Sequence, residues 1–138
     1  MDKSWPRKAA NMFWMAAARN KEQRQISATQ MEMLLVPSVV CAAFAIELGI
    51  KAMLLPTGKT IKKHDLRKLF DALPESIQQE IISSSHKPLN EFNASLDSMA
   101  NTFDEWRYVF ELQSATVDLE FLELFGSAVR IATETHAP

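Results

Sequence analysis

An arginine and a histidine near the end of the sequence have a spacing that could support RNA cleavage without a metal ion. Five residues separate Arg130 from His136. A histidine can act as general acid and base in such a reaction, and an arginine can stabilise the negative charge of the phosphorane. Chance alone gives about 0.4 such pairs in a chain of this composition. The spacing suggests that Arg130 and His136 are two catalytic residues. The alternative is that the spacing arises by chance and the two residues share no function.

Cationic side chains are concentrated between residues 59 and 68, where Asp65 is the only acid. Such a cluster can neutralise the phosphates of RNA or DNA, and a helix that begins there also favours anions through its free N–H groups. The alternative is a solvated loop and helix face. The expected anion-binding residues are Lys62, Lys63, His64 and Arg67, together with Arg107 from a later segment.

Glu47 lies in a segment so apolar that its carboxylate is expected to be buried. A buried carboxylate must be paired or neutralised. Lys51 follows four residues later, which places the acid first in the favourable i,i+4 orientation. Arg107 is a second expected partner, because it adjoins the apolar residue Trp106. The group is interpreted either as an ion pair that fixes helix register or as the polar floor of a cleft.

Other chemistry is not supported by the residue types. The single cysteine, Cys41, lies in an apolar run and is expected to be a small buried residue. The three histidines are far apart in the sequence, so no metal site is expected. The segment 58–60 (Gly-Lys-Thr) lacks the first glycine of a phosphate-binding loop, since position 53 is Met53. No cofactor is expected.

The elements that must position these residues are all predicted to be helices. Glycine is scarce, with three in 138 residues, and no segment alternates with a period of two. A first helix is predicted over 6–23, followed by a polar connection to residue 30 that is partly helical. A second helix over 33–55 is apolar on nearly every side, which is typical of a central, buried helix.

The second half of the chain is predicted to add four more helices. His64 or Asp65 caps the third, and Pro74 begins the fourth. One long helix is predicted over 89–110 from apolar residues spaced alternately by three and four. The last helix is expected to begin at Ser114 or Thr116. The predicted architecture is a five- to six-helix up-and-down bundle in a single domain of residues 1–138.

Composition narrows the function classes. The net charge is −2, which argues against a protein that coats nucleic acid along its whole surface. The longest uncharged apolar run, 33–46, is shorter than the roughly 20 residues of a membrane span. We therefore expect a cytoplasmic protein that does not bind a membrane. Residues 1–30 are expected either to pack on the periphery of the bundle or to exchange with a second subunit.

Three segments, taken in order, resemble small bacterial proteins of the HEPN superfamily. They are Glu47 to Leu55, His64 to Phe70 and Phe103 to Tyr108, within a resemblance that covers about residues 38–112. The resemblance implies an all-helical bundle, often a homodimer, in bacterial defence or toxin–antitoxin systems, with an antitoxin or nucleotidyltransferase as a further partner. Many members are metal-independent RNases, and others bind RNA or nucleotides without catalysis.

The catalytic signature of that superfamily is an arginine followed four to six residues later by a histidine. Arg107 has no histidine within that distance, and Arg130 is followed by Ile131 where the family usually has a polar residue. A non-catalytic RNA- or nucleotide-binding module is therefore the first prediction. The alternatives are an endoribonuclease that uses Arg130 and His136, and a protein-interaction module that grips a partner through the exposed side of the 89–110 helix.

Overall fold

The computed structural model describes residues 2–109 and 117–138 and confirms the predicted all-α bundle. The only strands among these residues are two residues long. The elements in chain order are α1 (Trp5–Asn20), β1 (Arg24–Gln25), β2 (Met31–Glu32), α2 (Leu35–Leu54), the 3-10 helix η1 (Leu55–Thr57), α3 (Leu66–Asp71), α4 (Glu75–Ser84), α5 (Leu89–Met99), α6 (Thr102–Arg107) and α7 (Leu119–His136).

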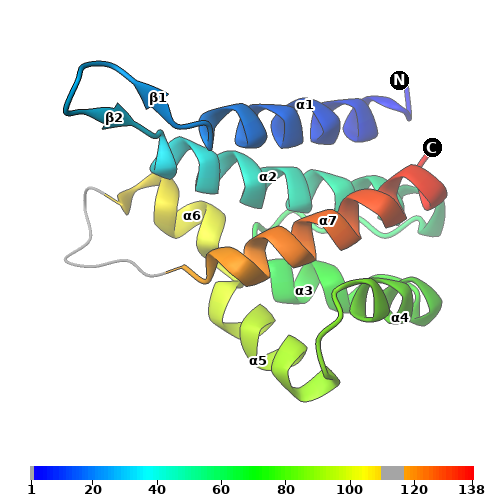
Figure 1. Cartoon of the computed structure of the whole chain (residues 1–138). Helices are drawn as coiled ribbons and strands as arrows, with labels where there is room; N and C mark the ends of the chain where they lie inside the picture. Colours follow the sequence, from blue (N-terminus) through cyan, green and yellow to red (C-terminus); the bar gives the residue numbers. More distant parts are fainter. Residues whose placement is uncertain (1, 110–116) are drawn as a thin grey trace.

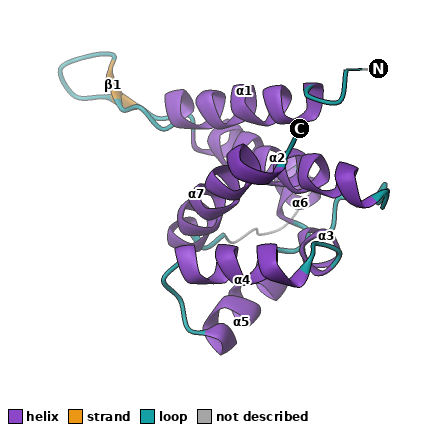
Figure 2. Ribbon diagram, turned by 90° about the vertical axis from the view of Figure 1, so that its right-hand side faces the viewer, coloured by secondary structure: helices purple, strands orange, loops and turns teal. Residues whose placement is uncertain are grey.

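Three long helices form one side of the bundle, and the short helices cover the other side (Figures 1 and 2). α1 and α2 are antiparallel neighbours, since Ser38 at the start of α2 donates a hydrogen bond to the carbonyl of Ala17 near the end of α1. α7 lies beside α2 and runs in the same direction (Figure 1). Helices α3 to α6 pack beneath α2 and α7, so α2 is surrounded as its sequence predicts.

α2 is the central helix because its apolar side chains go round the whole helix. Within the described residues, the segment Leu35–Thr57 is the one helix long and apolar enough to cross a membrane by length and composition. Its most apolar window is 61% buried inside the bundle. Burial against other helices accounts for this hydropathy, because a central core helix has the same composition as a span.

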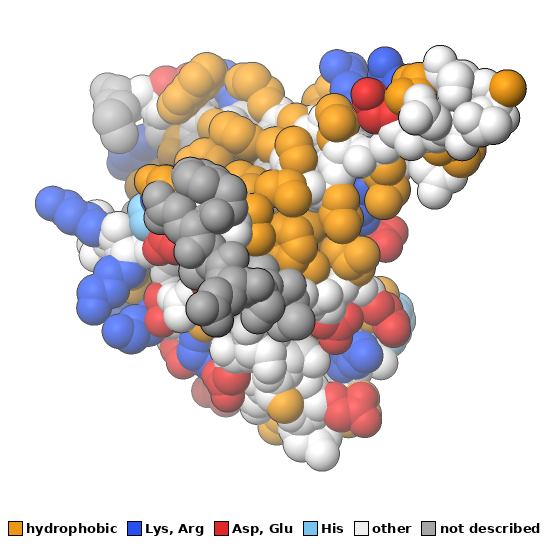
Figure 3. All heavy atoms as spheres, turned by 90° about the vertical axis from the view of Figure 1, so that its left-hand side faces the viewer, with side chains coloured by type: hydrophobic (Ala, Val, Ile, Leu, Met, Phe, Trp, Pro, Cys, Tyr) orange, Lys and Arg blue, Asp and Glu red, His pale blue; other side chains and the backbone are white. Residues whose placement is uncertain are grey.

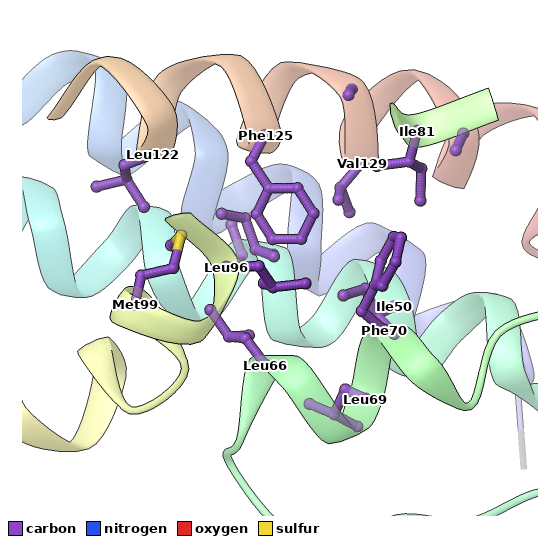
Figure 4. Close-up of a cluster of buried hydrophobic side chains, with 14 of the residues drawn as sticks. Ile50, Leu66, Leu69, Phe70, Ile81, Leu96, Met99, Leu122, Phe125 and Val129 are labelled. Carbon is purple, nitrogen blue, oxygen red and sulfur yellow. The ribbon is translucent and has the colours of Figure 1, made fainter. Parts of the chain in front are cut away.

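The centre of the core is a cluster of phenylalanine rings between α3, α5 and α7. Phe125 on α7 lies 6.0 Å from the ring of Phe70, 5.6 Å from that of Phe92 and 5.4 Å from that of Phe121, measured between centroids. All four rings are at most 1% exposed. Figure 4 shows Phe70 and Phe125 among aliphatic side chains from α2, α3, α4, α5 and α7.

Two glycines allow α1 to approach α2 and α7 closely through the indole of Trp14. A methyl group on Gly49 would lie 2.8 Å from both the Trp14 ring and the hydroxyl of Thr133 on α7. A methyl group on Gly126 would lie 3.9 Å from the indole nitrogen of Trp14. The absence of these side chains allows α1 to pack against the bundle, with Trp14 as the main anchor.

The prediction of one helix over 89–110 is wrong for the described residues. α5 ends at Met99 and α6 begins at Thr102, because the carbonyl of Ala100 accepts a hydrogen bond from the backbone N–H of Leu66 at the start of α3 (2.9 Å). Position 110 lies outside the described residues. Among the described apolar residues of this pattern, those from Phe92 to Trp106 are at most 7% exposed, whereas Leu89 is 57% exposed. The protein-interaction alternative stays a prediction.

Two further boundaries differ from the predictions. The connection after α1 is an antiparallel hairpin, in which Arg24 pairs with Glu32, and it contains no helix. The predicted starts of the last helix, Ser114 and Thr116, lie outside the described residues. α7 begins at Leu119 and is capped by Asp118, whose carboxylate accepts a hydrogen bond from the N–H of Phe121 (3.0 Å).

Candidate functional site

The polar centre of the molecule is Glu47, which projects from the middle of α2 and is fully buried. Its Oε1 lies 2.7 Å from Nζ of Lys51 and 2.6 Å from Nδ1 of His64. The ion pair with Lys51 is the one that the i,i+4 spacing predicts. The contact with His64 was not predicted, because the two residues are 17 positions apart and belong to different elements.

The second oxygen of the Glu47 carboxylate has no hydrogen-bond partner among the described residues. Charged groups in an apolar interior are normally paired and fully hydrogen-bonded. The half-satisfied carboxylate therefore depends strongly on its two contacts at Oε1. Lys51 and His64 are partly exposed, so the cluster connects a buried charge to the surface.

The loop that brings His64 to Glu47 is fixed at both ends. α2 continues into η1 and stops at Gly58, whose φ of 73° is in the left-handed region that glycine adopts without strain. At the other end Asp65 caps α3, and its side chain accepts a hydrogen bond from the N–H of Lys68 (3.1 Å). The predicted cap is confirmed at Asp65, and His64 is thereby left to turn inward.

The contact with Glu47 orients the imidazole of His64. A carboxylate accepts a hydrogen bond from the Nδ1–H of a histidine, which leaves Nε2 on the opposite side of the ring. The side chain of His64 is 37% exposed, so this second nitrogen belongs to the part of the site that faces away from the buried acid. A histidine held in this way can donate a hydrogen bond to an anion when it is protonated.

Aromatic rings form the wall beside His64. The His64 ring lies 5.3 Å from that of Phe103 on α6, and Phe103 stacks on Phe44 of α2 at 4.7 Å. The guanidinium of Arg107 lies 4.8 Å from the same Phe103 ring and 4.7 Å from the ring of Tyr108. His64 and Arg107 therefore share one aromatic neighbour, although their sequence positions are 43 apart.

Arg107 does not pair with Glu47, so that part of the prediction is wrong. Its guanidinium pairs with Asp104 at 3.2 Å, and its side chain is 40% exposed. The arginine is on the last turn of α6, and the Phe103 and Tyr108 rings hold it at the surface. It is positioned as a surface cation near His64 and not as a buried counter-ion.

Lys62 and Lys63 are exposed in the loop immediately before His64. In the same loop the Nζ of Lys59 donates to the carbonyl of Ala72 (3.1 Å), which ties the loop to the end of α3. No ion pair of Lys62 or Lys63 occurs with any described residue. Figure 3 shows Lys and Arg side chains gathered along one edge of a largely apolar face. Lys62 and Lys63 are thus exposed cations, and their role in binding an anion stays a prediction.

Arg67 is not available for an anion, contrary to the prediction. It makes several hydrogen bonds to the carboxylate of Asp71 and donates to Oδ1 of Asn93 on α5 (2.9 Å). Oδ1 of Asp97 lies 3.6 Å from Nη1 of the same guanidinium. The hydrogen bonds to Asp71 raise the pKa of Arg67 above its usual value. This arginine joins α3 to α5 and its charge is already balanced.

The proposed catalytic pair, Arg130 and His136, does not form a shared site. The two residues lie on one continuous helix, where six positions turn the chain by about 120° and advance it by about 9 Å. The guanidinium of Arg130 faces the Trp14 ring of α1 at 5.8 Å, whereas Nε2 of His136 contacts Glu80 of α4 at 2.8 Å. Because both residues lie on one helix, the spacing that suggested catalysis keeps their side chains apart.

The remaining reactive groups give no competing site. Cys41 is half-buried, and burial raises the pKa of its thiol, which disfavours the nucleophilic thiolate. In residues 2–109 and 117–138, no three His, Cys, Asp or Glu side chains are grouped in a way that could hold a metal ion. The Glu47 cluster and the cationic loop therefore form the best-defined polar site.

No protein-family model matches this chain, and no curated protein or solved structure is significantly similar to it. The function of the site is consequently argued from its geometry.

Proposed function

We propose that this chain is a HEPN-like helical bundle that binds the phosphates of RNA without cleaving it. The observation that carries the proposal is the contact between buried Glu47 and His64, which holds Nδ1 of the imidazole against the buried carboxylate. Lys62 and Lys63 precede that histidine at the surface, and Arg107 lies against the same aromatic wall. The loop and α6 together thus supply four donors.

The charge balance of this region supports an anionic ligand. Glu47 is compensated by Lys51 and Arg107 by Asp104, while Asp65 is committed to capping α3. The two loop lysines add positive charge that no described acid neutralises. RNA phosphates match this arrangement, because exposed lysines and a hydrogen-bonding histidine contact the backbone without reading its sequence. Tyr108, which is 47% exposed, offers a ring on which a base can stack.

Replacing both loop lysines is the direct test of RNA binding. The Lys62→Gln/Lys63→Gln variant is expected to bind a labelled single-stranded RNA more weakly, because two phosphate contacts are lost. The slope of log K against log salt concentration is expected to fall by about 1.4 for two contacts. Fluorescence anisotropy at several salt concentrations measures both quantities.

The matched control removes the same charge elsewhere. Arg24→Gln/Lys87→Gln changes a hairpin residue and a residue that contacts Glu120 on α7, and it is expected to leave RNA affinity within twofold. Equal losses in the two double variants would mean that net charge alone governs binding. RNA recovered from the same samples in EDTA and run on a denaturing gel must be intact, since cleavage would contradict a non-catalytic role.

A second candidate function, self-association, is favoured by the distribution of apolar side chains. Figure 3 shows a broad hydrophobic face beside the hairpin. Large exposed hydrophobic residues of the described chain are frequent in α1, the hairpin and the start of α2, including Met12, Met15, Met31 and Val36. A monomer rarely exposes a large continuous apolar patch, and a symmetric dimer buries the same patch on both copies.

A dimer through this face is expected to be insensitive to salt, because few charged pairs would form in it. Sedimentation at two salt concentrations measures the oligomeric state. Met15→Lys is expected to shift the protein to a monomer, whereas Leu89→Lys, an exposed hydrophobic residue on α5, is expected to leave the dimer intact. A wild-type monomer at micromolar concentration would contradict the proposal.

A further inference from the structure

A pocket of about 260 Å³ lies between α1 and α7, apart from the Glu47 cluster. Small residues on three helices create it, because large side chains at the same positions would fill the space. These residues are Ala17, Ala18, Ala42, Gly126 and Ser127. The wall of the pocket is formed by Trp14, and Arg130 lies on its lining one helical turn after Gly126. Neither the proposed RNA site nor the dimer face uses these two side chains.

The indole of Trp14 carries a buried donor that the fold does not satisfy. Trp14 is 8% exposed, and its Nε1 has no hydrogen-bond partner among the described residues. This nitrogen would lie 3.9 Å from a methyl group on Gly126, so it is directed toward the place where α7 lacks a side chain. Buried indole N–H groups usually have a partner, and this one has none among the described residues.

Arg130 adds a positive charge to the same lining. Its guanidinium lies 5.8 Å from the Trp14 ring, and it forms no ion pair with any described residue. The other two charges on the lining, Lys21 and Glu123, face each other at 3.7 Å and largely cancel. The pocket thus has one uncompensated positive charge, the guanidinium N–H donors of Arg130 and an apolar floor.

We propose that the pocket between α1 and α7 binds a small aromatic or aliphatic molecule that carries a single carboxylate. The guanidinium of Arg130 presents paired N–H groups that match the two oxygens of a carboxylate. The apolar part of the ligand lies against the Trp14 ring and the alanines of α1. A doubly charged phosphate ester is disfavoured, since only one cation of the lining lacks an acidic partner.

The test uses the full ¹⁵N-labelled chain and phenylacetate as the probe. The indole N–H resonance of Trp14, assigned through its contacts with α2 and α7, is expected to shift and saturate at millimolar phenylacetate. The indole resonances of Trp5 and Trp106 are expected to remain in place, since neither residue lines the pocket. The Arg130→Gln variant is expected to raise the Kd about tenfold or more, because a charge-assisted contact is lost.

Two comparisons separate the carboxylate site from general hydrophobic binding. Arg24→Gln removes an arginine of the hairpin and is expected to leave the Kd unchanged. The alcohol 2-phenylethanol has the same ring without the charge and is expected to bind at least tenfold more weakly. The absence of a saturable Trp14 shift, equal affinity for the alcohol, tighter binding of phenyl phosphate, or an unchanged Kd in Arg130→Gln would each overturn the proposal.

Discussion

Replacing Phe125 with alanine is expected to lower the free energy of unfolding by about 3–5 kcal/mol, the usual loss for a phenylalanine truncated in a close-packed core. The ring is completely buried and lies within 6.0 Å of three other phenylalanine rings, measured between centroids. The other rings come from α3, α5 and α7, and neighbouring helices hold these three in place. The cavity left by the substitution therefore cannot collapse fully. Urea denaturation followed by circular dichroism measures the difference.

The control for this substitution lies on the same helix. Leu119 is 43% exposed at the start of α7, and Leu119→Ala is expected to change the free energy of unfolding by less than about 1 kcal/mol. Both variants lose side-chain atoms from α7, but only Phe125→Ala opens a cavity. Similar losses in the two variants would show that the ring cluster is not the centre of the core.

Replacing Lys51 with methionine is expected to lower the free energy of unfolding by about 2–3 kcal/mol. The change leaves the carboxylate of Glu47 buried with one contact instead of two. Breaking a fully buried pair typically costs 3–5 kcal/mol, and the smaller value reflects the contact that His64 retains. Thermal and urea denaturation at neutral pH both measure this loss.

The double variant Glu47→Gln/Lys51→Met distinguishes a loss of charge pairing from a loss of packing. The neutral amide has nearly the shape of the carboxylate and has a much smaller desolvation penalty. We therefore expect the double variant to be more stable than Lys51→Met alone. A double variant that is no more stable than Lys51→Met would mean that the loss comes from packing at position 51 and not from the unpaired charge of Glu47.

Helices whose determinants are local were predictable from the sequence. α2 was expected over 33–55 and occupies Leu35–Leu54, because an uninterrupted run of apolar residues requires burial on all sides. The cap of α3 was expected at His64 or Asp65 and is formed by Asp65. In both cases the residues that decide the boundary lie within a few positions of it.

Features that depend on distant residues were not predictable. The 89–110 pattern continues across the break between α5 and α6, and what ends α5 is a hydrogen bond from Leu66, more than thirty positions earlier. The hairpin after α1 was missed because its strands are two residues long, too short for any alternating pattern. Spacing alone cannot report an interruption that is imposed from outside a segment.

The contacts of the candidate site show the same difference between local and distant determinants. The pair of Glu47 and Lys51 follows from spacing on one helix, whereas the contact between Glu47 and His64 requires the loop to fold back onto α2. Arg67 is cationic in the sequence but neutralised by Asp71, a neighbour that its i,i+4 spacing could have revealed. The unsatisfied indole of Trp14 has no sequence signal at all, since it depends on the approach of α7.

The order in which the chain leaves the ribosome limits when the core can form. Two of the four clustered rings, Phe121 and Phe125, lie on α7, within the last twenty residues of the described chain. Until α7 emerges, Phe70 and Phe92 have no partners on that side and their apolar surface faces water. In a nascent chain the apolar surface around Phe70 and Phe92 therefore stays open until α7 has been synthesised.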